Sequence, residues 1–352
     1  MWLTAFFGAL FFQFAIFQMT IFNSLSTHII ADLGLSNTEF GFIGSLYFYC
    51  AAIFLIPAGL WLDRGNIKKI IFLIFTLNLM ALLSFYFFPS VFTLIIYRVF
   101  CGISNCFGFL ACMKILSKCF SGKQLGIANS MIIAFSMLGG VLESPFEQIV
   151  NSIGWHNALL TVFAYGGISC LLMMLMLNTK VIKNKAVLAQ QPSHKIGPVI
   201  KEILSSPLNW QCGFYTGLMN LPVTLLAATW GSLYLINIKS LTSMQANSVI
   251  GMIFIGMIIA SPLIGWVSTH LLSRKNTMIV GAIASLIIII AIILIPASSF
   301  LVLMISFTLL GGVATTQILS YPIVTEANSL SVTGTAMSFI SILVYLIGAA
   351  LS

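Results

Sequence analysis

Three ionisable side chains lie within long apolar stretches of the sequence, where a charge is costly. Arg98 follows "VFTLIIY", and Glu143 and Glu147 follow "SMLGGVL". Charged groups inside apolar helices usually mark a path for ions or for a substrate. Counted from the helix ends expected below, Arg98 and Glu143 lie at matching depths, so we expect them to pair. Such a pair would carry a proton or receive an anionic substrate group; the alternative is a static pair that fixes helix packing.

Amide and hydroxyl side chains that recur at helical spacing are further candidates for contact with a substrate or with protons. Asn105 shares a helix face with Arg98, and Tyr345 shares one with two serines of the last apolar stretch. The residues expected to contact substrate or protons are Arg98, Asn105, Glu143, Gln13, Asn220, Gln317 and Tyr345. One arginine, one acid and several amides and hydroxyls suit a small polar or anionic solute. Taken singly, an amide or hydroxyl inside a span is more often a contact between two helices than a substrate ligand.

The composition determines which elements position these residues. The chain is 60% hydrophobic and 6% charged, with a mean hydropathy of +1.10. Soluble domains carry about 25% charged residues, so this chain is predicted to be an all-α, polytopic membrane protein in a lipid bilayer. Eleven apolar stretches are long enough to span it, at about 4–30, 40–61, 69–88, 91–115, 125–148, 156–178, 208–236, 246–270, 277–296, 299–321 and 331–351.

The basic residues predict the orientation of the chain. Thirteen of the 15 lysines and arginines lie at or beside the connections that follow an even-numbered span. The positive-inside rule places these connections, and with them the N-terminus, in the cytoplasm. The net charge of +8 is thereby explained by topology, and no soluble basic domain is left to bind nucleic acid.

The spans divide into two related groups. The long polar interval 179–207 is predicted to be a cytoplasmic linker between an N-terminal six-helix bundle, 1–178, and a C-terminal bundle, 208–352. A shift of 206 residues places Ser36 on Thr242 and Glu39 on Gln245, so each copy begins an even-numbered helix with a capping box. The same shift aligns the paired cations Lys68-Lys69 with Arg274-Lys275. Parallel repeats of this kind are typical of one large class of transporters.

The stretch "GLWLDRGNIKK" (59–69) resembles the signature between helices 2 and 3 of the major facilitator superfamily. Gly59, Asp63, Arg64 and Lys68 fall in register with it. Asn66 stands where glycine is usual, and we expect Asn66 to supply a left-handed conformation in its place. A second stretch, "RVFCG" (98–102), is similar to a motif of helix 4 in the same family.

The resemblance implies two six-helix bundles and a mechanism. The four signature residues would form a conformational latch, in which Asp63 faces the start of helix 11 near Ser331 and Thr333 and favours the outward-open state. Transport would follow by alternating access. "AFSMLGGVLESP" (134–145) matches the antiporter motif of helix 5 poorly, so we expect proton-coupled uptake of an amino acid, a peptide or an organic acid. An efflux antiporter, or a non-transporting membrane protein or sensor, is the alternative.

Further expectations concern partners, cofactors and completeness. The finer resemblance is to bacterial relatives of lysosomal dipeptide transporters and to amino-acid uptake carriers. We expect a monomer in the cytoplasmic (inner) membrane. No metal-ligand spacing, nucleotide-binding loop or nucleophile motif is present, so neither a cofactor nor an enzymatic activity is expected. The family has twelve helices and eleven are found, so the chain is a fragment, a frameshifted remnant or an eleven-helix protein.

Overall fold

The structure is a computed structural model that describes residues 2–120, 123–177, 196–270, 273–294, 296, 299–328 and 333–351. All regular elements within these ranges are helices. In the N-terminal half they are α1 (Trp2–Ser24), α2 (Ser26–Leu33), α3 (Asn37–Arg64), α4 (Ile67–Phe87), α5 (Val91–Cys119), α6 (Lys123–Val141), α7 (Glu143–Ile153) and α8 (Trp155–Met176). The C-terminal half contains α10 (Ile196–Ser205), α11 (Pro207–Met219), η2 (Pro222–Trp230), α12 (Gly231–Asn237), α13 (Ser243–His270), α14 (Arg274–Leu294), α15 (Phe300–Ala314), η3 (Thr315–Leu319), α16 (Ser320–Ala327) and α17 (Thr333–Leu351).

These elements confirm the predicted all-α membrane fold. Nine continuous helical segments of the described chain are long and apolar enough to cross a membrane. The remaining two predicted spans correspond to the consecutive helices α6 and α7, and to α17. Several spans are longer than predicted: the fifth extends to Ile153 rather than 148, and the tenth to Ala327 rather than 321.

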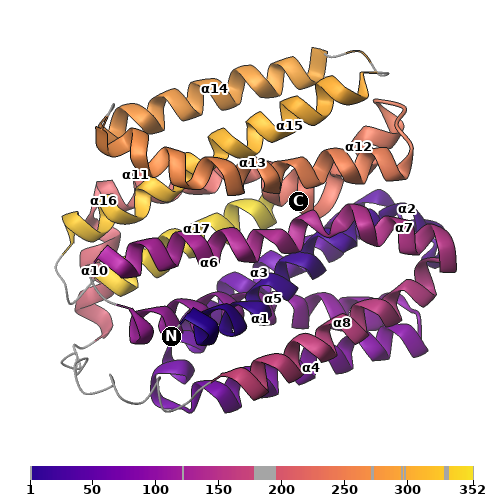
Figure 1. Ribbon diagram of the computed structural model, residues 1–352, viewed down its shortest axis with the longest axis horizontal. Coiled ribbons are helices and arrows are strands. Elements are labelled where there is room, and N and C mark those ends of the chain that lie inside the picture. The colour runs from indigo at the N-terminus through magenta and orange to yellow at the C-terminus, as the bar shows by residue number, and fades with distance from the viewer. Residues whose placement is uncertain are drawn as a thin grey trace.

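The helices run side by side along the long axis of the molecule (Figure 1). Helices α2, α4, α7, α12 and α14 finish at one end, which we call the Gly34 end after the residue that follows α2. Helices α3, α5, α8, α13 and α16 finish at the opposite end, which we call the Gly65 end after the residue that follows α3.

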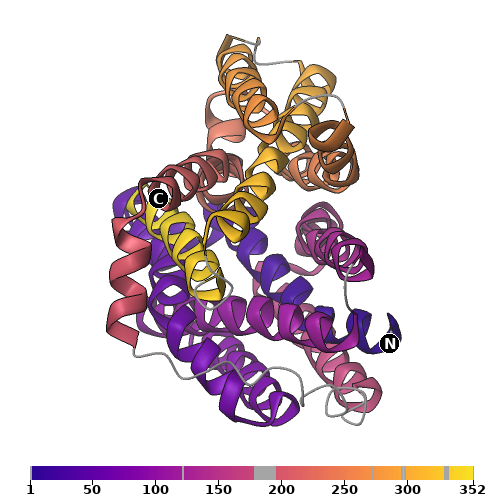
Figure 2. The same cartoon turned by 90° about the vertical axis from the view of Figure 1, so that its left-hand side faces the viewer.

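The two halves repeat the same local structure. Helices α3 and α13 each contain 28 residues, and their first residues, Asn37 and Ser243, differ by the predicted shift of 206. The predicted capping boxes are present in both: Ser36 and Glu39 exchange hydrogen bonds, as do Thr242 and Gln245. Viewed along the helices, the N-terminal helices gather below and most C-terminal helices above, with α17 against the N-terminal half (Figure 2).

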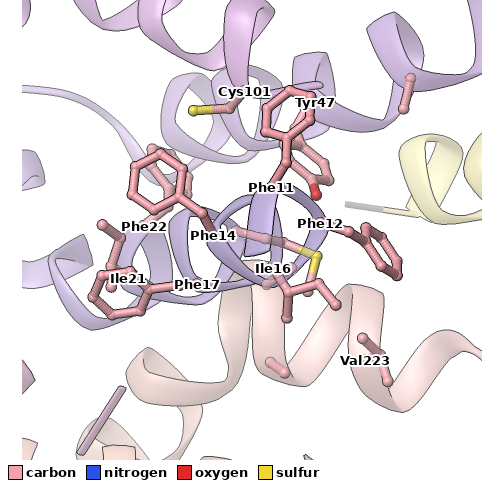
Figure 3. Packing of buried hydrophobic residues seen from close by; sticks show 14 of the residues in the cluster. Phe11, Phe12, Phe14, Ile16, Phe17, Ile21, Phe22, Tyr47, Cys101 and Val223 are labelled. Atoms are coloured by element: carbon pink, nitrogen blue, oxygen red, sulfur yellow. The ribbon is translucent and has the colours of Figure 1, made fainter. Parts of the chain in front are cut away.

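Helix α1 forms the centre of the N-terminal half. In the most apolar 18-residue stretch of α1, 83% is buried inside the protein, whereas the share for α14 is 22%. Helix α1 is therefore a core helix, and α14 faces lipid. A helix that is apolar on all sides lies either in a protein core or in a membrane. Phenylalanines project from α1 in several directions (Figure 3). One of them, Phe11, stacks on Phe75 of α4 with 4.7 Å between the ring centres.

Glycines allow the closest helix crossings. A Cβ atom added to Gly102 of α5 would lie 2.3 Å from the carbonyl oxygen of Tyr47 in α3. In the other half, a Cβ added to Gly311 of α15 would lie 1.9 Å from the carbonyl oxygen of Ile253 in α13. Tyr47 and Ile253 are related by the repeat shift, so corresponding residues of α3 and α13 each face a glycine of a neighbouring helix. Small residues are the usual means of close helix packing in membranes.

The structure corrects the expectation for Asn66. Its φ is −77°, which is not left-handed, and its side chain accepts hydrogen bonds from the backbone N–H groups of Lys68 and Lys69. Asn66 therefore serves as the N-cap of α4, a position that asparagine favours for its side-chain acceptor. The predicted linker also contains a helix, α10, that was not predicted.

Candidate functional site

Arg98 lies on α5, enclosed by α1 and α3. Its side chain is 0% exposed, and its guanidinium carbon lies 4.0 Å from the ring centre of Phe22 and 5.0 Å from that of Tyr47. Nη2 donates a hydrogen bond of 3.1 Å to the carbonyl oxygen of Gly44. Nε and Nη1 have no hydrogen-bond partner. Aromatic faces stabilise the cation in part, but a buried arginine with two unused donor groups is a site that an anion would stabilise further.

Glu143 does not pair with Arg98 in this structure, contrary to the prediction. Its Oε1 accepts a hydrogen bond of 2.9 Å from the hydroxyl of Ser24 on α1, and its Oε2 has no partner. Equal depth along two helices does not determine the direction in which each side chain points. Arg98 points toward Phe22 and α3, whereas Glu143 points toward the last residue of α1.

Asn105 and Tyr345 meet across the two halves of the molecule. The Asn105 amide on α5 donates to the Tyr345 hydroxyl on α17 at 3.0 Å. Asn105 lies near the middle of α5, two helical turns from Arg98. The sequence singled out both residues, and the structure brings them into direct contact.

Asn220 and Gln317 also meet, within the C-terminal half. The Gln317 amide donates to the Asn220 side-chain oxygen at 3.2 Å. Both residues lie where a span leaves α-helical geometry: α11 is followed by the π-helix η2, and α15 by the 3₁₀ helix η3. Irregular helical segments within spans are tolerated beside protein or water, and they often occur at functional sites.

Gln13 contacts a residue that the sequence analysis did not select. Its side-chain oxygen accepts a hydrogen bond from the hydroxyl of Tyr165 on α8. A buried network next to it was also missed: Gln18 and Asn78 exchange hydrogen bonds of 3.1 and 2.6 Å, and Gln18 reaches the Tyr97 hydroxyl at 3.4 Å. Amides on different spans have no spacing that relates them, so the sequence carries no signal for such pairs.

Hydrogen bonds near the Gly34 end connect the two halves. Asn23 of α1 donates to the carbonyl oxygens of Leu226 at 3.1 Å and Ala227 at 3.3 Å, and it accepts from the backbone N–H of Ser232 at 3.1 Å. Ser232 in turn donates to the side-chain oxygen of Asn247.

Two further contacts join α7 to α13. The Asn247 amide donates to Glu147 Oε2 at 2.9 Å, and the hydroxyls of Ser144 and Ser248 lie 2.9 Å apart. Glu147 and Asn247 are both almost fully buried. The chain of contacts from Asn23 through Ser232 and Asn247 to Glu147 holds the halves together at this end of the bundle.

The predicted latch is described only in part. Gly59 lies within α3, and Lys68 Nζ donates to the carbonyl oxygen of Leu177, just after α8, at 3.3 Å. Lys68 therefore connects two helices of the same half. The side chains of Asp63 and Arg64, and those at the start of α17, lie outside the described part of the structure.

Two cavities of the structure are lined by other residues than those above. An open groove of about 440 Å³ at the Gly34 end is lined by parts of α3, η2 and α17, including Trp230 and Ala349. A smaller one, of about 100 Å³, lies between α3, α10 and α17. The described residues contain no group of three metal-ligating side chains.

Comparison with known proteins identifies the family. The model of the Major Facilitator Superfamily matches residues 5–352. The chain belongs to this superfamily. It is an integral membrane protein, and its relatives and structural neighbours are transporters rather than enzymes.

Its relatives by sequence are distant. A probable hexose phosphate transport protein of Chlamydia muridarum is 23% identical over 78% of this chain and 66% of its own length. A probable galactarate/D-glucarate transporter of Bacillus subtilis, GudP, is 24% identical over 62% of this chain and 53% of its own length. The chain thus matches less than two thirds of the length of these relatives.

Solved structures show the same fold. A bacterial homolog of the human lysosomal transporter Spinster, in an inward-facing and occupied conformation, has a TM-score of 0.78 at 18% identity, covering 99% of this chain and 79% of its own. The nucleoside transporter NupG, as a mutant, has a TM-score of 0.75 at 14% identity, covering 99% and 89%. The fold predicted from the signature "GLWLDRGNIKK" is confirmed.

Proposed function

We propose that this protein takes up a small anionic solute by alternating access, with protons as the coupling ion. The observation that carries the proposal is Arg98, which is fully buried and keeps two nitrogen atoms without a hydrogen-bond partner. No carboxylate of the described residues forms an ion pair with it. A buried cation of this kind is costly unless a negative charge approaches it, and a substrate anion would supply that charge.

The relatives narrow the range of solutes. One is named a probable hexose phosphate transport protein and another a probable galactarate/D-glucarate transporter, and both names denote anions. Among the predicted classes they favour an organic acid, and they add phosphorylated sugars. The amide pair Asn220–Gln317 would then serve the uncharged hydroxyl groups of such a solute, because a neutral amide can both donate and accept.

The broken spans supply the movement that alternating access requires. Spans that contain η2 and η3 can bend where their α-helical hydrogen bonding is interrupted. The proposal places the Gly65 end in the cytoplasm, because the basic residues of the connections gather there. In this structure the hydrogen bonds through Asn23, Ser232 and Asn247 then close the outer side. The protein acts as a monomer, since both halves of the site belong to one chain.

The test is uptake by proteoliposomes that contain the full chain. Radiolabelled glucose 6-phosphate, glucarate and uncharged glucose are supplied outside, with and without an imposed inward proton gradient. We expect saturable uptake of an anion, stimulated by the gradient, and no uptake of glucose. Efflux of preloaded solute stimulated by the same inward proton gradient would instead identify an antiporter, and binding without flux would identify a sensor.

A further inference from the structure

Two buried carboxyl groups lie one helical turn apart on α7. Glu143 is 0% exposed and Glu147 is 1% exposed. Their residue spacing of four places both on one face of α7, and Glu147 lies against α13 of the other half. Oε2 of Glu143 has no hydrogen-bond partner.

The surroundings of this pair contain no counter-charge among the described side chains. Helix α7 packs against α1, α6, α8 and α13. The described side chains of α1, α6 and α13 include no ionisable group. On α8, the His156 ring packs against Tyr86, and the Tyr165 hydroxyl donates to Gln13. The charged group that faces each carboxyl is therefore the other carboxyl.

Two negative charges in such a place would be strongly unfavourable. Burial removes an unpaired carboxylate from the water that stabilises its charge, and a second carboxylate one turn away adds repulsion. The hydrogen bonds from Ser24 and Asn247 satisfy one oxygen of each group. The unpartnered oxygen of Glu143 is left without the donor that an ionised carboxylate requires. The pair therefore holds at least one proton while the halves are in contact here.

We propose that Glu143 and Glu147 together form a proton-binding site that couples protonation to closure of the Gly34 end. When that end is open, α7 is separated from α13, both carboxyls meet the outer water, and the pair takes up a proton from it. Closure buries the protonated pair, and loss of the proton toward the Gly65 end lets α7 separate from α13 again. This inference rests on the proposed function, since it assigns the site at which the coupling proton is taken up. The sign follows from the burial: acid on the side of the Gly34 end favours closure.

The experiment measures the distance between the two halves as a function of pH. Spin labels at Asn151, at the end of α7, and at Asn237, at the end of α12, are both exposed and lie at the Gly34 end. The labels are placed in the full chain after replacement of its seven cysteines, in lipid nanodiscs, and distances are recorded from about pH 5 to about pH 9.

We expect a short distance at low pH and a growing fraction of longer distances as the pH rises. The double variant Glu143→Gln and Glu147→Gln, which imitates the protonated pair, is expected to keep the short distance throughout. Glu39→Gln is the matched control, because Glu39 is an exposed glutamate at the same end and glutamine preserves its capping box. The distance between the labels in the Glu39→Gln variant should change with pH as it does in the parent protein.

Asn247→Leu provides a second, independent variant. It removes the hydrogen bond to Glu147 without removing a carboxyl, so the open fraction should increase while the dependence on pH remains. A distance that does not respond to pH, or a double variant that responds like the parent, overturns the inference.

Uptake by the same variants separates this inference from the proposed function. If the parent takes up solute under a proton gradient and the double variant responds to the gradient equally, the proton site is wrong and the function stands. If no solute is moved but the distance titrates as expected, the proton site stands and the proposed function is wrong.

Discussion

The two halves of the molecule share a packing plan but differ in where they carry charge and where they bend. Arg98, Glu143 and Glu147 all lie in spans of the N-terminal half. There α5, which carries Arg98, is one continuous helix of 29 residues. In the C-terminal half the seventh and tenth spans change into η2 and η3, and their described polar contacts are amides and hydroxyls. The comparison indicates that Arg98 is carried by a continuous helix, whereas the seventh and tenth spans of the other half supply neutral contacts and interrupted helices.

The largest expected effect is on uptake, and it compares a charged site residue of the N-terminal half with a neutral one of the C-terminal half. Arg98→Ala should lower kcat/KM for uptake of the anion about 100-fold, because it removes a charged partner in a buried site. Gln317→Ala should lower it about 10-fold or less, since a neutral hydrogen bond contributes about 0.5–1.5 kcal/mol.

Lys239→Ala is the control for Arg98, because Lys239 is another buried cation but lies at the Gly34 end, where it donates to the carbonyl oxygen of Ile293. Uptake of the anion by the Lys239→Ala variant should stay close to that of the parent protein. Equal losses for Arg98→Ala and Gln317→Ala would contradict the division of roles.

A second expected effect tests whether the halves really share one packing plan. Gly102→Ala and Gly311→Ala should each lower the free energy of unfolding by about 1–3 kcal/mol, because the new methyl group would overlap a backbone carbonyl. Gly251→Ala, with no atom within 4 Å of the added Cβ, should be harmless. Thermal unfolding in detergent measures all three. Destabilisation in one half only would show that the repeat does not extend to the helix crossings.

The smallest expected effect compares two amide pairs in double-mutant cycles. Gln18 and Asn78 are fully buried and exchange two hydrogen bonds, so their coupling energy for unfolding should be about 1 kcal/mol. Asn220 and Gln317 share one bond at 3.2 Å, so about 0.5 kcal/mol is expected. Leucine substitutions at each position are suitable. A stronger coupling for Asn220–Gln317 would make the C-terminal site the more rigid one.

Local sequence signals predicted the fold because they depend on neighbours in the chain. Such signals are the capping boxes at Ser36 and Thr242, the apolar spans and the signature at 59–69. The structure confirms the capping boxes and the spans. The family match confirms the fold that the signature implied. Asn66 shows the limit even of local signals. The same residue type suits a left-handed turn and an N-cap, and only the backbone distinguishes them.

The arrangement of the site was less predictable, because it depends on which way each helix face points. Asn105 and Tyr345 were selected separately, and their contact across the halves could not be foreseen from spacing. The Arg98–Glu143 pair was expected from depth alone and is not formed. Asn247, which holds Glu147, lies among apolar residues of α13 at a position that no motif marks.

Binding to the purified protein tests the central claim most directly, because it requires neither a gradient nor a direction of transport. Isothermal titration of the full chain with glucose 6-phosphate, glucarate and glucose should show that an anion binds and glucose does not. Arg98→Gln should abolish that binding, and Arg98→Lys should retain part of it. Equal affinity for glucose and the anions, or undiminished anion binding by Arg98→Gln, would contradict the account.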